Sequence, residues 1–140
     1  SESSSSTFSK INKDSIYYKK KLNFFNFGSK SNFFKEKIIQ TKTLENYLKK
    51  KNIKSIDLIK IDTEGHEFEI LKGLKNEINK INIIIFEHHY DNMLYKNYTF
   101  SMINDYLKKK SFKKVFKIKM PFRKSFEYIY INNKKQFTIN

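Results

Sequence analysis

A chain of 140 residues is long enough for one modest domain with a real core, but it is short for a complete nucleotide-cofactor fold. It contains no cysteine, so disulfides and thiolate metal sites are excluded. No apolar run approaches the roughly 20 residues that a membrane-spanning helix needs, and the N-terminus lacks the features of a signal peptide. We therefore expect a cytoplasmic protein with no membrane partner, and we assign no residue to a metal.

The formal net charge of +15 raises the question of nucleic-acid binding, because clustered basic residues neutralise phosphates. Arg123 is the only arginine, however, so the planar side chains that read base edges are nearly absent. An AT-rich genome would produce such a lysine-rich composition by codon drift. From Ile56 to Asp91, moreover, eight acidic residues stand against four lysines. These features argue against nucleic acid as the partner.

Residues 1–35 are polar and lack a clean hydrophobic period, so we expect an irregular lead-in. A serine run occupies positions 3–6. The aromatic residues between Phe24 and Phe34 are expected to cover part of a core, because disordered segments are usually poor in aromatics. The domain itself is predicted over residues 36–133, followed by a tail at 134–140.

The first half of this domain begins with a short strand, predicted from Ile38 to Gln40. Thr43 is a suitable N-cap for a helix to about Lys51, with Leu44, Tyr47 and Leu48 spaced as one face. The mostly apolar run from Ile56 to Ile61 is typical of a strand buried between helices. A turn follows, and then a second helix that is predicted to bury one face. The residues of that face are Phe68, Leu71, Leu74 and Ile78.

The second half starts with another buried strand, Ile81 to Phe86, and Thr99 is a suitable cap for a third helix. Two final strands are predicted, Lys113 to Lys119 and Phe126 to Ile131, with a turn at Pro121. This alternation predicts an α/β fold: a mostly parallel sheet with helices on both faces and a C-terminal hairpin that adds one antiparallel strand. The first two buried strands should be parallel neighbours, with the last two strands beyond the second.

Polar residues follow these two buried strands at their carboxyl ends, where open α/β sheets bind their ligands. Asp62 ends the first strand, with Glu64 and His66 just beyond it, and Glu87 ends the second, before His88 and His89. If the strands are neighbours, carboxylates and imidazoles converge on one rim. Such groups could bind a cation, hold a polar substrate or act as general bases.

These candidates have structural alternatives. Glu64 and Glu67 could simply complement a helix N-terminus, and each of the histidines could be solvent-exposed or structural. A site role is favoured for Asp62, at a strand tip before a tight turn, and for Glu87, since an acid after an apolar run is otherwise costly. The three glycines of the chain cannot form the glycine-rich turn of a nucleotide site.

Three stretches of the sequence resemble the FkbM family of methyltransferases. The sequence from Thr43 to Leu48 resembles the helix "TL-x-x-(Y/F)L", and DLIKIDTEGHEFEILKG, from Asp57 to Gly73, resembles the family signature "DLIKIDVEGxExxVLKG". The run from Ile83 to Glu87 is similar to the family's next strand, which also ends in an acid.

This resemblance implies a class I, Rossmann-like methyltransferase fold and methyl transfer from S-adenosyl-L-methionine to a small-molecule or glycan acceptor, commonly the hydroxyl of a sugar or natural product. In that fold a glycine loop after the first strand and an acid after the second strand hold the cofactor, and this sequence has neither. We therefore expect the C-terminal portion of such a domain, a fragment that is inactive in isolation.

The resemblance also implies roles for the polar residues of the rim. Asp62 would line the junction between cofactor and substrate, and Glu64 would orient Asp62 or the substrate. Glu87 would face the same cleft, with His66 as a further substrate contact and His88 as the general base for a hydroxyl acceptor.

Two alternatives to this function stay open. One is a non-enzymatic module that binds RNA or an anionic surface through its lysine-rich flanks, and the other is an inactive remnant that still folds. If the chain is a fragment, the outer edge of the strand from Ile56 to Ile61 is open. We then expect self-association through that edge unless the lead-in covers it.

Overall fold

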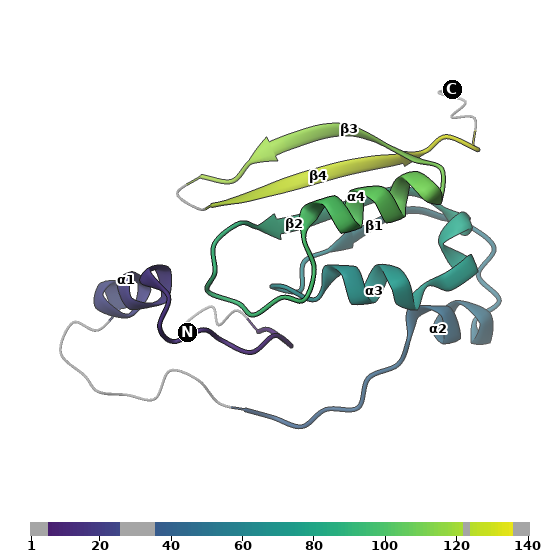
Figure 1. The fold of residues 1–140 in the computed structure, drawn as a ribbon. Coiled ribbons are helices and arrows are strands. Elements are labelled where there is room, and N and C mark those ends of the chain that lie inside the picture. Colours follow the sequence, from purple (N-terminus) through teal and green to yellow (C-terminus); the bar gives the residue numbers. More distant parts are fainter. Residues whose placement is uncertain (1–5, 26–35, 122–123, 136–140) are drawn as a thin grey trace.

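The computed structural model describes residues 6–25, 36–121 and 124–135, and Figure 1 shows how they are arranged. The elements, in chain order, are α1 (Ile16–Phe25), α2 (Leu44–Lys50), β1 (Ile56–Ile61), α3 (Glu67–Gly73), the short 3-10 helix η1 (Lys75–Lys80), β2 (Ile81–His89), α4 (Phe100–Lys109), β3 (Phe112–Lys119) and β4 (Ser125–Asn132). Within these ranges no helix is both long and apolar enough to cross a membrane. The expectations for the aromatic side chains between Phe24 and Phe34, and for residues 136–140, lie outside what the structure describes.

The four strands form one sheet in the order β1-β2-β4-β3. β1 and β2 run parallel, with Ile56 opposite Ile81 and Ile61 opposite Phe86, and β4 is antiparallel to both β2 and β3. The predicted neighbours and the place of the last two strands are confirmed. The predicted hairpin with one antiparallel strand is also found, as β4. The sheet is nevertheless mixed and not mostly parallel in its pairings, because β4 inserts between β2 and β3 and both of its pairings are antiparallel.

The packed helices cover one face of the sheet, whereas the sequence predicted helices on both. Ile84 and Phe86 of β2 belong to the core, and Ile83 and Ile85 point to the other side because side chains alternate along a strand. A right-handed crossover from β1 to β2, and another from β2 towards β3, both advance in the same direction across the sheet. Both therefore place their helices on the same side. On the other face, apolar side chains remain exposed in the described part of the chain: Leu58, Phe116 and Ile118.

The core itself is the one that the hydrophobic spacing predicted. Phe68, Leu71, Leu74 and Ile78 are all buried, although a positive φ at Lys75 ends the α-helix and the last turn continues as η1. The capping residues also behave as predicted, since Thr43 accepts a hydrogen bond from Asn46 N and Thr99 from Met102 N. In α2, however, Leu48 is buried whereas Tyr47 is exposed.

Two local expectations are wrong. The segment from Ile38 to Gln40 forms no strand, and Ile38 and Ile39 are exposed, because two β-branched residues do not make a strand without an edge to pair with. The lead-in, expected to be irregular, contains α1, whose first turn is capped by Ser15 through a hydrogen bond from Tyr18 N. The sequence does not predict this helix because its apolar residues do not share one face: Tyr18 is buried, whereas Ile16 is exposed.

The lead-in also contacts the rest of the domain. Ile11 forms an antiparallel bridge with Leu94, Asn12 N donates to Met93 O at 2.7 Å, and Tyr95 N donates to Lys10 O at 2.9 Å. Residues 10–12 and 93–95 are therefore held side by side, close to the carboxyl ends of β1 and β2.

Candidate functional site

The turn that follows β1 is shaped by Glu64 and Gly65, which both have a positive φ. A Cβ atom on Gly65 would lie 2.9 Å from Ser9 Oγ, so only glycine fits at this position. The lead-in closes over the turn from outside: the Thr7 hydroxyl donates to Glu64 O at 2.6 Å, and Ser9 Oγ donates to Gly65 O at 2.8 Å. Two hydrogen bonds to the backbone thus connect the lead-in to the signature turn.

Glu67, the first residue of α3, holds the same turn from inside. Its side chain is buried, and Oε1 accepts hydrogen bonds from Gly65 N at 2.9 Å and from the Thr63 hydroxyl at 3.2 Å. Oε2 accepts a hydrogen bond from the Tyr98 hydroxyl. Burial, together with the Glu67 carboxylate, raises the pKa of Tyr98, which keeps that hydroxyl protonated as a donor. Glu67 is therefore committed to the turn and to the segment before α4.

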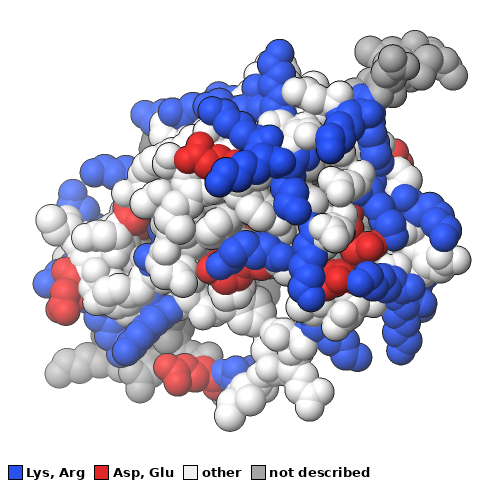
Figure 2. All heavy atoms as spheres, turned by 45° about the vertical axis from the view of Figure 1, so that its right-hand side comes forward, with Lys and Arg blue, Asp and Glu red and all other residues white. Residues whose placement is uncertain are grey.

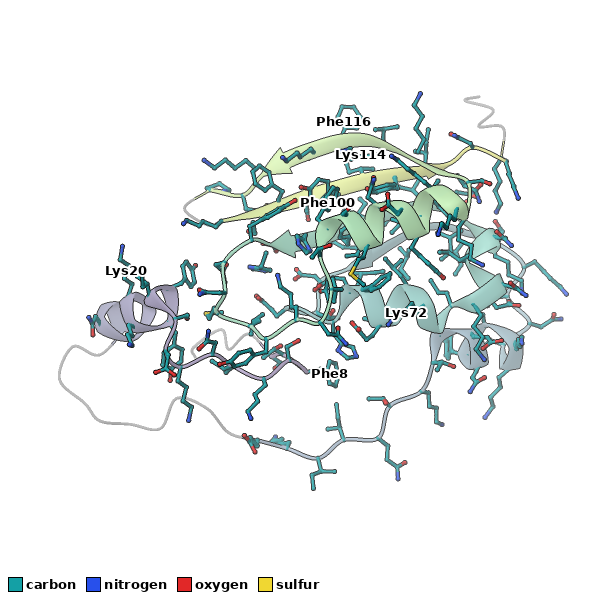
Figure 3. The ribbon with its side chains drawn as sticks, viewed as in Figure 1. Phe8, Lys20, Lys72, Phe100, Lys114 and Phe116 are labelled. Atoms are coloured by element: carbon teal, nitrogen blue, oxygen red, sulfur yellow. The ribbon has the colours of Figure 1, made fainter. Side chains whose placement is uncertain are left out.

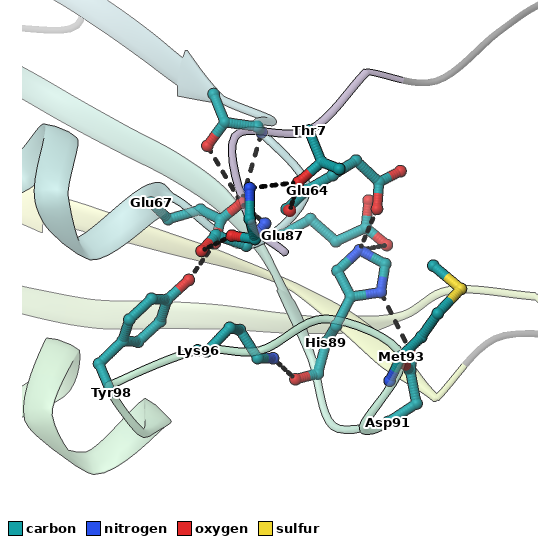
Figure 4. Close-up of polar contacts among 12 residues, drawn as sticks. Thr7, Glu64, Glu67, Glu87, His89, Asp91, Met93, Lys96 and Tyr98 are labelled. Atoms are coloured by element: carbon teal, nitrogen blue, oxygen red, sulfur yellow. Dashed lines mark hydrogen bonds and ion pairs between the residues drawn. The ribbon is translucent and has the colours of Figure 1, made fainter. Parts of the chain in front are cut away.

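His89 lies at the centre of an acidic cluster at the carboxyl ends of β1 and β2 (Figure 4). Its Nε2 atom is 3.2 Å from Glu64 Oε2 and 3.5 Å from Glu87 Oε1, and its Nδ1 atom is 3.5 Å from Asp91 Oδ2. Burial alone would lower the pKa of His89, but Asp91, Glu64 and Glu87 outweigh burial and raise it above its ordinary value. The pKa of Asp91 is lowered in spite of its burial, with His89 as the main cause. We call Glu64, Glu87, His89 and Asp91 the His89 cluster.

His88, the predicted general base, points to the opposite face of β2. It is buried among aromatic rings, with its centroid 4.9 Å from that of Tyr90 and 5.9 Å from those of Tyr98 and Phe100. Burial, and then the nearby Lys96 ammonium, lower the pKa of His88 to about 4, so its imidazole is neutral at neutral pH. Its catalytic role stays a prediction, but the structure brings His89, and not His88, to Glu64 and Glu87.

The other two predicted residues lie beside this cluster and not within it. Asp62 is exposed just after β1, and the ring of His66 is 5.5 Å from that of Phe8 in the lead-in. Their predicted roles at the cofactor junction and the substrate stay predictions. Of the five residues singled out in the sequence, the structure therefore groups Glu64 with Glu87.

Sequence reasoning missed the central position of His89 and the part played by Asp91. Strand alternation carries the signal, since Glu87 and His89 are two residues apart and share a face, whereas His88 lies between them. It also missed Lys96, whose ammonium donates to the His89 carbonyl oxygen from a half-buried position. Burial lowers the pKa of this lysine.

The His89 cluster is an ion-paired histidine in a ring of carboxylates. Over the described ranges, no group of three or more histidine or acidic side chains is placed to hold a metal ion. An imidazole with one nitrogen facing a buried aspartate and the other facing Glu64 has a fixed orientation. In such an arrangement Nε2 and a neighbouring carboxylate can share a proton, and that carboxylate can accept a proton from a substrate.

Comparison with known proteins identifies relatives of this chain. The profile of the Methyltransferase FkbM domain matches residues 1–114. A stretch of 33 residues is 46% identical to hexuronic acid methyltransferase AglP of Haloferax volcanii. This stretch covers 24% of the chain and 14% of AglP, so the similarity spans a small part of that protein. No solved structure shows significant similarity to the chain.

Proposed function

Because the chain belongs to the FkbM methyltransferase family, we propose that it forms the acceptor side of an S-adenosyl-L-methionine-dependent O-methyltransferase. The acceptor is a hydroxyl of a sugar or another natural product. Family membership supports the reaction class, and the observation that carries the site is the His89 cluster at the carboxyl ends of two parallel strands. A cytoplasmic location belongs to the same proposal.

The chemistry needs a group that takes the proton of the acceptor hydroxyl as the oxygen gains a methyl group. Glu64 is the most accessible acid of the His89 cluster, with a side chain 16% exposed, against 7% for Glu87 and 4% for Asp91. In the proposal, the hydroxyl meets the cluster at Glu64 and gives its proton to that carboxylate. Asp91 positions His89 from behind, and Glu87 helps to keep the imidazole charged.

S-adenosyl-L-methionine would supply the methyl group, but the described residues do not form a site for it. Asp62 offers one exposed carboxylate after β1, in keeping with its predicted place at the cofactor junction. Neither described glycine belongs to a glycine-rich turn, since Gly65 is closed off by Ser9 and Gly73 ends α3 beside Thr43. We propose that an N-terminal half of a class I, Rossmann-like domain holds the cofactor and pairs with the edge of β1 that no described strand occupies.

A sugar acceptor is supported by AglP, whose name assigns it a hexuronic acid as substrate. Since the similarity covers a short stretch of both proteins, the acceptor of this chain is part of the proposal. The order β1-β2-β4-β3, with a single antiparallel strand among four, is compatible with the second half of the fold that the family resemblance implies.

The first test is calorimetric titration of the 140-residue chain with S-adenosyl-L-methionine. We expect weak binding or none, and a micromolar dissociation constant would contradict the assignment of the cofactor grip to another segment. Adding an N-terminal half with a glycine-rich turn should restore binding and methyl transfer.

In that longer protein, Glu64→Gln should lower turnover by about 100-fold, the lower end of the usual range for loss of a general base. The matched control is Glu77→Gln on η1, because the Glu77 side chain is 13% exposed, close to the 16% of Glu64, and lies outside the site. Asp62→Ala should also reduce turnover. Unchanged turnover in Glu64→Gln would remove Glu64 from the proposed role.

A second candidate is a module that binds RNA or another polyanion through its lysines. Figure 2 shows basic side chains (blue) spread over much of the face in view, with acidic ones (red) next to them. On β3 the ammonium groups of Lys114 and Lys117 lie over the rings of Phe100 and Phe126, at 5.3 and 4.1 Å. If this candidate is right, the 140-residue chain will bind single-stranded RNA in a salt-dependent manner.

A further inference from the structure

A cleft of about 400 Å³ lies next to the signature turn and is distinct from the His89 cluster. Residues 8–10 of the lead-in, residues 65–66 with Glu69 at the start of α3, and residues 95–97 after β2 line it. Figure 3 shows Phe8 below α3, away from the β3–β4 hairpin. A cleft of this volume is large enough for a small ligand such as a monosaccharide.

Hydrogen bonds between the three lining segments make the cleft a built feature of the fold. Ser9 Oγ donates to Gly65 O at 2.8 Å, and Tyr95 N donates to Lys10 O at 2.9 Å. The contact of Ser9 with Gly65 is so close that no larger residue fits at position 65. The lead-in is thus positioned as one wall of the cleft without any ligand.

The charge that the cleft presents is positive. Lys10 is exposed in its wall, and Lys96 is half-buried. Over the described part of the chain, one hydrogen bond engages the Lys96 ammonium, to the His89 carbonyl oxygen, and an ammonium has three N–H donors. Glu69 is the acid of the lining, but its carboxylate oxygens are shielded from solvent and Lys72 Nζ lies 3.5 Å from Oε1.

Aromatic rings form the apolar part of the wall. Phe8 is 53% exposed and lies against His66, and Tyr95 is 57% exposed. Exposed rings beside polar groups favour ligands that have both an apolar face and hydroxyl groups. A sugar ring has both, with C–H groups on its faces and hydroxyls at its rim, and Asn97 adds an amide that can bind hydroxyls.

We propose that this cleft binds an anionic sugar, with its carboxylate or phosphate at Lys96 and Lys10 and its ring against Phe8 and Tyr95. The inference rests on the proposed function in one respect, because it takes the cleft to be the place where the acceptor of that reaction binds. It adds to that function the class of acceptor and the residues that recognise it.

The test uses the 140-residue chain and needs no methyl donor. Methyl β-D-glucuronide, glucose 6-phosphate and methyl β-D-glucoside are titrated separately, and binding is followed by NMR shifts of the amides of residues 95–97. Acetate and inorganic phosphate are the controls for the anion alone. We expect binding of at least one anionic sugar about tenfold tighter than that of the neutral glucoside, as is usual for a charged hydrogen bond.

Paired variants assign that preference to the cleft. Lys96→Gln should remove the tenfold preference for the anionic sugar, and Lys10→Gln, at an exposed position, should reduce it without risk to the fold. Lys113→Gln is the matched control, since Lys113 is an exposed lysine on β3. Phe8→Ala should weaken all three sugars, while Phe116→Ala, at an exposed phenylalanine of β3, should not.

Each outcome decides the proposal. The proposal fails if neutral and anionic sugars bind with equal affinity, or if no sugar binds. It also fails if acetate or phosphate binds as tightly as the sugars, or if Lys113→Gln lowers the affinity for the anionic sugar as much as Lys96→Gln does. If the cleft binds anionic sugars selectively but the longer protein transfers no methyl group, the assignment of the cleft stands and the proposed function is wrong. Transfer to a neutral acceptor, with no binding of anionic sugars, would do the reverse.

Discussion

The two sides of β2 at its carboxyl end surround two adjacent histidines with groups of opposite character. On one side His89 faces Glu64, Glu87 and Asp91, and these acids raise its pKa. On the other side His88 is packed among aromatic rings, and burial lowers its pKa to about 4. Two adjacent residues of the same type are thus a charged and a neutral group at the same pH.

This difference shows that the surroundings, and not the residue type, decide which histidine can take part in proton transfer. A neutral imidazole enclosed by rings stabilises the fold by packing, whereas an imidazole held by carboxylates is a proton-holding group. Strand alternation assigns each histidine to its side. The comparison makes the side of His89 the one to test for chemistry and the side of His88 the one to test for stability.

The largest effect is expected where the two sides are joined, at Glu67. This buried carboxylate binds Gly65 N and the hydroxyl of Tyr98, whose ring lies near His88. Glu67→Ala leaves both donors without their acceptor, so we expect a loss of about 4 kcal/mol in the free energy of unfolding. Urea denaturation measures it. Glu69→Ala, on the same helix, is the control, and a loss below about 1 kcal/mol in Glu67→Ala would mean that the turn does not depend on this carboxylate.

The next effect separates the two histidines by pH. The pKa of His88 in the folded state is lowered from 6.5 to about 4, so its contribution to stability is complete above pH 6.5 and is lost as the pH falls towards 4. Over that range the wild-type protein should therefore lose about 3 kcal/mol in the free energy of unfolding through His88, a loss that His88→Phe should not show. Denaturation of the two proteins at pH 7 and pH 4.5 measures the difference, and parallel losses would contradict the burial of a neutral His88.

His89→Phe should show the opposite pH dependence. Its pKa is raised in the folded state, so its contribution is complete below its ordinary pKa and disappears as the pH rises through the raised value. The penalty of His89→Phe should thus be larger at pH 6 than at pH 9. If both variants respond to pH alike, the contrast between the two sides of β2 does not hold.

Much of the fold could be predicted because its signals are local. Thr43 and Thr99 cap helices, and the apolar runs of β1 and β2 form parallel neighbours. The prediction that β1 is buried between helices is wrong, because β1 is an edge strand with helices on one face, and of its six residues Ile61 alone is buried. The one-sided placement of the helices depends on the direction in which successive crossovers advance, and the lead-in contacts join residues about 57 and 80 positions apart. No local pattern contains that information.

The site could be predicted in part for the same reason. Glu64 and Glu87 each follow a strand, and the strands are neighbours, so their proximity follows from topology. The choice between His88 and His89 needed the strand to continue beyond Phe86, and β2 runs to His89. Because the sequence predicts a strand from Ile81 to Phe86 only, strand alternation could not be used to place the two histidines on opposite sides.

The smallest effect concerns the two edges of the sheet. On β3 the edge carries exposed lysines and a bulge between Lys114 and Phe116, features that discourage pairing with another chain. Over the described residues, β1 pairs with β2 alone, and the exposed Leu58 lies on the uncovered face of this edge strand. We therefore expect reversible self-association through β1 and not through β3. Sedimentation at rising concentration should show it, and Leu58→Lys should weaken it about tenfold, the loss expected when a leucine is no longer buried. Phe116→Lys, at an exposed apolar position on β3, should leave it unchanged. A stable monomer at high concentration, with exchange-protected amides from Asp57 to Ile61, would mean that the β1 edge is covered, and the proposal that an N-terminal half pairs there would then fall.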